Sequence, residues 1–475
     1  MRHPLLCLAI LLTGLLPGFS LTVSLDAPDA VMPSWEKLLA AHPLPESIKT
    51  VRAAPGQVQA VDRIKVRLGA SAGTRVVERI LLAPVARIWE APPAATMARV
   101  RSGAMRVLPL ESITLPDMAL PVDGLFADQP GYPLIAEVAV SVHGNDQYLH
   151  AWYDTLPAAL SGPAPAAIVW IEAVGDIMPA RGVDAILREP DGPERVFGNT
   201  LPLLRAADLL LGNLEAAATT SSRRVVKSYN FRFAPAALEA LARAGFSYLS
   251  IANNHSFDFG REGFADTLQA LAGSGIGTSG LGLSQDEAQA PFIRRIRDTE
   301  IRVLSFGAFP VDPGGFDGKR DAKAAEGVPG MLWLDDEGLA EASRAFSRSS
   351  FNIVLVHGGD EWSGRPTSDQ KRWYRALVDA GADLVIGTHP HVLQGMEARA
   401  SGLIAYSLGN FLFPGMEDTR GGEDSVILKV GVLQGRIIAV QAFSVRLAGA
   451  TVRGAAGGAA AATLRSLSMA LGPGK

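Results

Sequence analysis

From residue 168 onward, short apolar runs of strand length end abruptly in polar or glycine-containing clusters. The runs that show this pattern are 168–171, 207–211, 248–251, 353–356, 384–386 and 403–406. Between several of them, the spacing of apolar residues predicts helices over 235–244, 262–272 and 369–380. Strands that alternate with helices are typical of an α/β domain with a largely parallel sheet.

The chain before and after this region has a different pattern. Residues 25–154 alternate short apolar runs with Pro and Gly turns, which predicts a smaller α+β accessory domain. Residues 155–167 are rich in Pro, Ala and Gly and are expected to form a linker. Residues 447–475 are dominated by Ala and Gly, which predicts a frayed tail with a short helix over 459–471. The α/β domain is therefore expected over 168–446.

The first residues, 1–24, have the pattern of an export segment. A short positive start precedes an apolar run over 5–16 and a helix-breaking exit, as in a secretory signal. The run is shorter than the roughly 20 residues of a spanning helix, although continuation to residue 25 would allow a retained anchor. Both alternatives predict an exported protein of the periplasm or cell envelope, which in the second case is anchored in the membrane.

Composition limits the partners and ligands. The 475 residues carry a formal net charge of −4, so there is no basic excess to neutralise the phosphates of nucleic acid, and no nucleic-acid partner is expected. An anionic substrate would have to be held by local cations. The only cysteine is Cys7, inside the apolar leader, so any metal must be bound by nitrogen and oxygen.

The polar clusters suggest where chemistry takes place, because ligands of parallel α/β folds gather beyond the carboxyl ends of the strands. The residues that follow the predicted strands are Asp176, Glu215, Asn254, His255, His357, His389 and His391. Each has an ordinary alternative explanation, such as a helix cap or a first-turn glutamate. Seven such residues at one edge indicate a metal site.

His389-Pro390-His391 is the sharpest single feature of this set. In an extended segment, alternate residues point the same way, so both imidazoles are expected to face one cavity. A surface turn with two solvated histidines is the alternative.

These residue types suit divalent metal. Imidazole and carboxylate ligands fit one or two ions of Mn, Zn, Fe or Mg, and a carboxylate can bridge two ions about 4 Å apart. A bound water has its pKa lowered to roughly 7, which provides a nucleophile for hydrolysis. Asp176 and His255 are the candidate catalytic residues. His255 would either protonate a leaving group or coordinate the metal.

Six ordered motifs resemble those of the CapA family of poly-γ-glutamate capsule proteins, within the metallophosphatase superfamily, over about 168–447. The motifs are Gly175-Asp176-Ile177-Met178, Gly212-Asn213-Leu214-Glu215, Asn253-Asn254-His255-Ser256, His357-Gly358-Gly359-Asp360-Glu361-Trp362, His389-Pro390-His391 and Tyr406-Ser407-Leu408-Gly409-Asn410-Phe411. The resemblance implies a metallophosphatase-like sandwich of two β-sheets flanked by helices, with metal at its top edge and the seven polar residues as ligands or catalytic groups.

The resemblance also implies roles around the metal. It implies that Lys227, Tyr229, Phe231 and Arg232 hold a carboxylate or phosphate of the substrate, with a solvated hairpin as the alternative. It further suggests that Asp258, Glu361 and Asn410 orient histidines. One position departs from the pattern: Met178 stands where other metallophosphatases have a histidine ligand, and a thioether binds hard ions poorly.

The leading functional hypothesis is a metal-dependent hydrolase or transfer factor of capsule or envelope polymer, most simply poly-γ-glutamate. Its expected partners are the anionic polymer and membrane-bound machinery that makes it. One alternative is a non-catalytic assembly factor that binds polymer, and another is a phosphoesterase for nucleotides or other phosphate esters. The glycine-rich segment 311–330 either covers the site or forms an ordinary disordered excursion.

Overall fold

The computed structural model describes residues 21–26, 32–44, 48–52, 63–68, 74–88, 95–156, 165–416, 419–455 and 457–471. It contains two compact units, and the division between them falls inside strand β4 (Arg75–Arg87), after Pro84. Residues 1–20 of the expected export segment lie outside the described residues, as does most of the expected linker. Strand β1 (Leu21–Asp26) begins within the segment that was assigned to export.

The first unit is the predicted small α+β domain. Its sheet has the order β2-β1-β3-β7-β4-β5, with β1 parallel to its neighbours and the other pairs antiparallel. The remaining strands are β2 (Ile48–Arg52), β3 (Arg63–Leu68), β5 (Val107–Pro109) and β7 (Ile135–His143), and the helices are α2 (Met32–Ala41), α3 (Met97–Arg101), η2 (Leu110–Ser112) and α4 (Gln147–Thr155). Trp35 of α2 meets Trp152 of α4 edge to face at 6.0 Å, which forms the centre of a small core.

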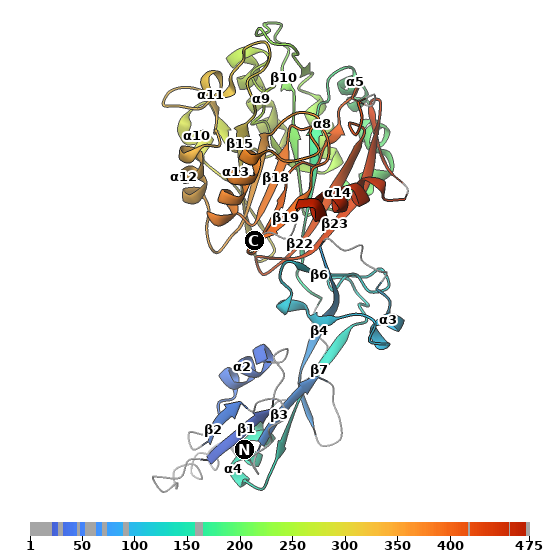
Figure 1. Ribbon diagram of the computed structural model, residues 1–475, viewed down its shortest axis with the longest axis vertical. Helices are drawn as coiled ribbons and strands as arrows, with labels where there is room; N and C mark the ends of the chain where they lie inside the picture. Colours follow the sequence, from blue (N-terminus) through green and yellow to red (C-terminus); the bar gives the residue numbers. More distant parts are fainter. Residues whose placement is uncertain are drawn as a thin grey trace, which may run out of the picture. The chain divides into compact units, whose positions relative to one another are not determined.

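The second unit contains two large sheets, which Figure 1 shows running side by side. The first has the order β12-β9-β8-β22-β23-β24, with β21 also paired to β8. Its strands are β8 (Val169–Ile177), β9 (Leu209–Leu214), β12 (Phe246–Ser250), β21 (Asn410–Leu412), β22 (Asp424–Leu433), β23 (Arg436–Ala448) and β24 (Thr451–Gly454). Strands β12, β9, β8 and β21 are parallel, whereas β22, β23 and β24 are antiparallel.

The second sheet has the order β14-β15-β17-β18-β20-β19. Its strands are β14 (Phe292–Ile296), β15 (Thr299–Ala308), β17 (Phe351–Gly358), β18 (Leu384–Thr388), β19 (Met396–Arg399) and β20 (Gly402–Ala405). The four central strands are parallel and the two edge strands antiparallel. The six apolar runs in the sequence correspond to the parallel strands β8, β9, β12, β17, β18 and β20, whereas the parallel strands β15 and β21 match none of these runs.

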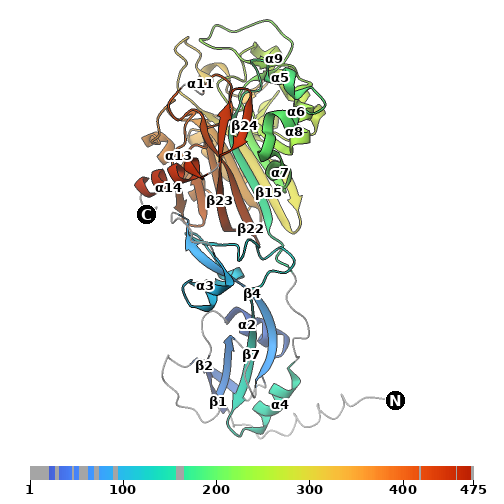
Figure 2. The same cartoon turned by 90° about the vertical axis from the view of Figure 1, so that its right-hand side faces the viewer.

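Helices cover the outer faces of both sheets, as Figure 2 shows for α6, α7 and α8 on one side and α13 and α14 on the other. The helices are α5 (Val183–Leu187), α6 (Gly192–Phe197), η3 (Gly198–Thr200), α7 (Leu201–Arg205), α8 (Ala237–Ala244), α9 (Gly260–Ser274), α10 (Gln285–Gln289), α11 (Gly318–Asp321), α12 (Asp336–Ala345), α13 (Ser368–Asp379) and α14 (Ala459–Leu471). Short strands complete the unit: β6 (Asp117–Ala119), β10 (Ala217–Ala218), β11 (Arg232–Phe233), β13 (Leu281–Gly282) and β16 (Gly330–Met331). The two-sheet α/β fold and the smaller α+β domain are both confirmed.

The chain after residue 446 is part of the second unit, which corrects the prediction of a frayed tail. β24 pairs with β23, and Val452 within it is fully buried. Helix α14 has the bounds expected for a short helix, but it packs against β19 of one sheet and against β22 and β23 of the other. Ala460 and Leu464 are buried there, so small residues in this segment permit close packing.

Segment 311–330 is likewise ordered. It contains α11 and leads into β16, and Phe316 within it is buried. The alternative of a disordered excursion is therefore wrong. No described helix has the length and apolar character needed to cross a membrane.

Candidate metal centre

Asp176 reaches the site because β8 is irregular near its end. The register with β9 shifts between Ala173 and Asp176, and a bulge of this kind re-aims the side chain that follows it. Gly175 permits the distortion, since a Cβ there would collide with the carbonyl oxygen of Gly409 at 1.8 Å. That carbonyl accepts a hydrogen bond from the Asp176 N–H at 3.0 Å. The carboxylate of Asp176 is fully buried as a result.

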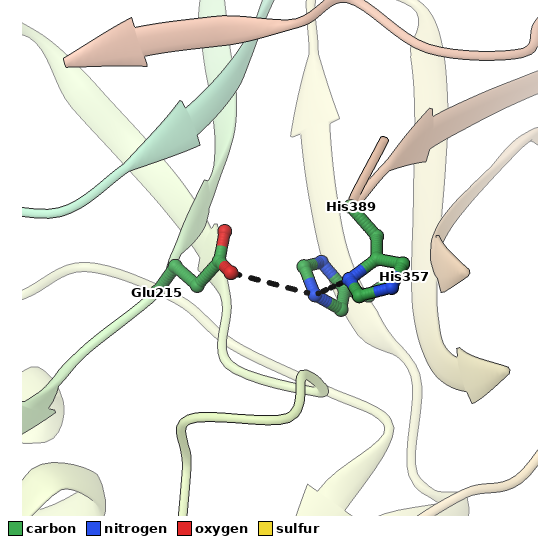
Figure 3. Close-up of side chains that lie close together, drawn as sticks. All are labelled: Glu215, His357 and His389. Carbon is green, nitrogen blue, oxygen red and sulfur yellow. Dashed lines mark hydrogen bonds and ion pairs between the residues drawn. The ribbon is translucent and has the colours of Figure 1, made fainter. Parts of the chain in front are cut away.

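Glu215 lies directly after β9 and is also fully buried. Its Oε1 has three imidazole nitrogens around it, Nε2 of His357 at 3.7 Å, of His391 at 3.8 Å and of His255 at 3.9 Å. Figure 3 shows the carboxylate pointing toward His357, with His389 behind it. This oxygen has no hydrogen-bond partner among the described residues, and an unpaired buried carboxylate oxygen is costly.

His357 points between the sheets because of strand alternation. Val354 and Val356 of β17 pack on the helix side of the sheet, so His357 faces the other side. Its Nε2 lies 2.9 Å from Oδ1 of Asn254 and 3.1 Å from Nδ1 of His389. Its Nδ1 lies 3.0 Å from the hydroxyl of Thr388. A tautomer that donates from Nδ1 to Thr388 leaves Nε2 free to coordinate metal.

His389 and His391 converge, but not through an extended backbone. Both have left-handed φ angles, +96° and +60°, which side chains other than glycine rarely adopt. The predicted extended backbone is therefore wrong, although the centres of the two rings do lie 6.1 Å apart. Strained residues of this kind are held by their surroundings and cluster at functional sites.

The buried side chains form two overlapping groups that could each hold a metal ion. One contains Glu215, His357 and His389, and the other contains Asp176, Glu215 and His391, with ligand atoms in each group within 4.8 Å of one another. Glu215 belongs to both, as expected of a carboxylate that bridges two ions. The amide of Asn254 adds an oxygen beside the first group. The donor set of nitrogen and oxygen, together with the unpaired Oε1, fits one or two divalent ions.

Burial shifts the pKa values of the carboxylate and imidazole groups in this cluster. Burial raises the pKa of Glu215 well above its ordinary value, and the neighbouring Asp176 charge raises it further. Burial lowers the pKa of His357 and of His389 well below the usual range, helped by the other histidines. Burial also acts to lower the pKa of His391, but contact with Asp176 outweighs it and the net shift is upward. Two neutral imidazoles therefore stand ready to bind a cation.

His255 lies at the edge of this cluster in a chain of buried polar groups. Its Nδ1 is 2.7 Å from Oδ2 of Asp258, whose other oxygen is 2.7 Å from the ammonium of Lys227. The carboxylate fixes the tautomer with hydrogen on Nδ1, so Nε2 faces Glu215 with a free lone pair. Burial lowers the pKa of His255, even though Asp258 opposes the shift.

Two asparagines complete the network and were missed as site residues in the sequence. Asn213 donates to Asp176 Oδ1 at 2.8 Å and approaches Nδ1 of His357 at 3.1 Å. Asn253 donates to Oδ1 of Asn213 at 3.0 Å and accepts the N–H of His255 at 3.0 Å. Both stand inside the Gly-Asn-Leu-Glu and Asn-Asn-His motifs, so their position beside a candidate ligand was the available signal.

The three residues expected to orient histidines differ in what they do. Asp258 contacts His255 as described, and Asn410 accepts from Nδ1 of His391 at 2.8 Å, which leaves Nε2 of that ring facing Glu215. Glu361 is exposed, and no hydrogen bond joins it to a described histidine. Its charge instead helps to raise the pKa of Glu215 and His391.

Met178 and the expected substrate-binding residues lie as follows. The Met178 side chain is buried in the apolar core of the second unit. The side chain of Lys227 is fully buried against Asp258 and the carbonyl of Asn254, so it does not face solvent as a substrate-binding cation would. Tyr229 is 65% exposed and stacks on Phe231, whose ring lies 4.4 Å from that of His255. Arg232 donates to the carbonyls of Thr220 and Ser221.

Curated relatives match the second unit. The chain is 32% identical over 243 residues to "PGA biosynthesis protein CapA" of Bacillus subtilis, which covers 50% of this chain and 62% of that protein. It is 32% identical over 250 residues to "Capsule biosynthesis protein CapA" of Bacillus anthracis, covering 50% and 58%. The match thus spans less than two thirds of these relatives.

A solved structure described as a novel phosphatase from Mycoplasma pneumoniae aligns with 59% of this chain and 94% of its own, at 14% identity and a TM-score of 0.38. A likeness at that level does not bear on function. The family described as "Bacterial capsule synthesis protein PGA_cap" matches residues 171–415, just over half of the 475 residues and all of the candidate ligands. The chain belongs to this capsule synthesis protein family.

Proposed function

We propose that the protein is a metal-dependent hydrolase that acts on a capsule or envelope polymer during its synthesis or processing, with poly-γ-glutamate as the substrate. The observation that carries the proposal is the unpaired Oε1 of Glu215, buried among three imidazole nitrogens at 3.7–3.9 Å. A buried anionic oxygen in that position is stabilised by a cation.

Glu215, His357 and His389 would hold one divalent ion, and Asp176 and His391 would complete a second position that shares Glu215. When bound, a divalent ion supplies Lewis-acid chemistry and activates water for attack on an amide or phosphoester bond. We propose Mn, Zn, Fe or Mg as the ion, because nitrogen and oxygen donors suit each of these metals to a different degree. Asn213 holds Asp176 in place through its 2.8 Å hydrogen bond.

His255 is the residue that would carry a proton. Its Nε2 lies 3.9 Å from Glu215 Oε1, beside the point where a scissile bond would sit, and Asp258 fixes the opposite nitrogen as a donor. A histidine held in this way would first accept a proton on the free lone pair of Nε2 from the attacking water and would then give it to the leaving amine of a cleaved γ-glutamyl bond. Asp258 in turn forms an ion pair with Lys227 at 2.7 Å.

The location follows from the proposed substrate. A capsule polymer lies outside the cytoplasm, and the relatives that are named for capsule biosynthesis support a proposal of action at the cell envelope. We therefore include export, by the leader over residues 1–24 as signal or anchor, in the proposal. The expected partners are the anionic polymer and the membrane-bound machinery that makes it.

A second candidate is a non-catalytic factor that binds polymer during assembly, and Met178 favours it. The position that other metallophosphatases fill with a histidine ligand is here part of the apolar core. One metal position has therefore lost a nitrogen ligand, and a weakened site can stabilise the fold without turnover.

The test uses the full chain, loaded with Mn²⁺ or Zn²⁺ and compared with chelator-treated protein. Poly-γ-glutamate of defined length is incubated with each, and chain length and new amino ends are measured. Metal-dependent shortening supports the proposal. Polymer binding without shortening supports the assembly factor, and metal-dependent cleavage of a generic phosphodiester with intact polymer would show a phosphoesterase.

A further inference from the structure

A cavity opens beside His255 and its partners Asp258 and Lys227, and none of the residues assigned above as ligands lines it. Its volume is about 350 Å³. It is lined by Val225, Val226, Phe257, Phe316, Arg261 and Arg320, together with nearby glycines and Asp321. Val226 is 89% exposed at its rim, which is unusual for a large apolar side chain.

The cavity shares its walls with the proposed proton carrier. Phe257 stands two residues after His255, and the N–H of Val225 donates to the backbone carbonyl of Asp258 at 3.0 Å. The ammonium of buried Lys227 lies 5.0 Å from the centre of the Phe316 ring. A group bound in the cavity would therefore lie close to the buried residues His255, Asp258 and Lys227.

The cations on this side are not equally available. Lys227 is committed to Asp258 and to the carbonyl of Asn254. Arg320 is committed to both oxygens of Asp321, at 2.7 and 2.6 Å, and to the carbonyl of Gly315 at 3.0 Å. Arg261 is exposed and makes no hydrogen bond or ion pair with any described residue. Of the three, Arg261 is the cation that a ligand can use.

We propose that this cavity is a subsite for one carboxylate-bearing residue of an anionic chain, with Arg261 as the residue that binds its carboxylate. The guanidinium matches a carboxylate in a planar, two-bonded arrangement. The apolar floor of Val225, Phe257 and Phe316 takes the methylene groups between the carboxylate and the backbone of the chain. The subsite rests on the proposed function for its substrate, and it assigns to Arg261 the role expected of Lys227.

The lining also favours a carboxylate over a phosphate. Asp321 contributes a negative charge to the same cavity, and Arg320 largely neutralises it. One free guanidinium then balances one negative charge, whereas a more highly charged phosphate group would meet repulsion from Asp321. The ligand class is therefore a singly charged carboxylate on an aliphatic stem.

The test measures binding of a γ-linked glutamate oligomer to the metal-loaded full chain by calorimetry. Three proteins are compared: wild type, Arg261→Gln, and Arg294→Gln as a matched control. Arg294 is an exposed arginine of β14 that makes no hydrogen bond or ion pair with a described residue, and it lies beside the start of β15, at the opposite end of its sheet from His357. We expect Arg261→Gln to weaken binding about tenfold, as for loss of a charge-assisted pair, and Arg294→Gln to leave it unchanged.

Two further ligands identify the chemistry. An oligomer with its carboxylates converted to carboxamides should bind wild type and Arg261→Gln equally. Glycerol phosphate, a monoester that carries more than one negative charge at pH 7, should show no dependence on Arg261.

The subsite is overturned by equal affinities of wild type and Arg261→Gln for the glutamate oligomer, by absence of oligomer binding to wild type, or by Arg261-dependent binding of glycerol phosphate alone. If polymer turnover does not depend on Arg261, the subsite is wrong but the proposed hydrolase activity stands. If binding depends on Arg261 but no metal-dependent turnover occurs, the subsite stands and the proposed hydrolase activity is wrong.

Discussion

Strand β8 carries two buried carboxylates, Glu172 and Asp176, whose surroundings differ. Glu172 is paired across the sheet with Lys429 of β22, whose ammonium lies 3.3 Å from it and 4.8 Å from the ring centre of Trp170. Asp176 has no lysine or arginine partner in the described part of the chain. It accepts hydrogen bonds from Asn213 and from the N–H of His389, and its ionic neighbours are His357 and His391.

The difference shows what a buried charge needs. A carboxylate removed from water is costly unless a cation or several hydrogen bonds compensate it. The fold supplies that cation for Glu172. For Asp176 and Glu215 it supplies imidazole nitrogens and no lysine or arginine ion pair among the described residues, so the missing positive charge has to come from outside the chain.

The largest expected effect is a difference in metal affinity between two variants that each replace one buried glutamate by glutamine. Glu215→Gln removes a charge and an oxygen ligand, and we expect it to lower metal affinity by more than about 100-fold. Glu172→Gln removes the same charge from the other end of β8 and should leave metal binding unchanged. The metal content of both variants is measured by mass spectrometry after dialysis. An equal loss of metal in both variants would contradict the proposed difference between Glu215 and Glu172.

A second prediction separates metal binding from chemistry. His255→Gln should lower polymer cleavage by about 10²- to 10⁴-fold, the usual contribution of a general acid, while metal content stays at the wild-type level. His150→Gln, at an exposed histidine of the first unit, serves as the control. Loss of metal in His255→Gln would instead make His255 a ligand.

A third prediction concerns the residue that orients His391. Asn410→Ala removes the acceptor 2.8 Å from Nδ1, so the ring can rotate away from Glu215. We expect metal affinity to fall by about 10- to 100-fold, less than for a direct ligand. Competition with a coloured chelator measures the constant, and unchanged affinity would mean that His391 is not held by Asn410.

The smallest expected effect is on stability, and it belongs to the Glu172 region alone. Burial raises the pKa of Glu172 to about 7, although Lys429 opposes the shift. The folded protein thus binds a proton there that the unfolded chain releases near pH 4.5, so stability falls as pH rises from about 4.5 to about 7. The loss is at most about 3 kcal/mol.

Glu172→Gln removes this pH-dependent part. Denaturant unfolding at pH 5 and pH 8 should show a smaller decrease between the two values for the variant than for wild type. An identical decrease in both proteins would show that Glu172 stays charged throughout the range.

The parallel core of the fold was predictable from sequence because its signals are local. The run 353–356 before His357 and the run 384–386 before Thr388 are short, apolar and followed by polar residues, and both are strands. Helix α13 starts at a capping box formed by Thr367 and Gln370, and a glycine follows its end. The antiparallel strands β22 and β23 were not recognised, since no polar cluster marks their ends.

The residues that form the candidate site could be predicted from the sequence, but their backbone conformations and burial could not. Strand ends placed Asp176, Glu215 and His357 at one edge, and the structure brings them together. The left-handed backbone of His389 and the burial of Lys227 depend on contacts with distant segments, which a local pattern does not contain. A basic residue in a polar loop looks the same in sequence whether it faces a substrate or a buried aspartate.

The most direct test of the central claim is diffraction from crystals of the full chain grown with Mn²⁺, using its anomalous signal. The account predicts a peak about 2.0–2.2 Å from Glu215 and from nitrogens of His357 and His389, with any second peak beside Asp176 and His391. A Mn²⁺ peak only at other residues, or an unchanged cluster with no peak at saturating Mn²⁺, would contradict it.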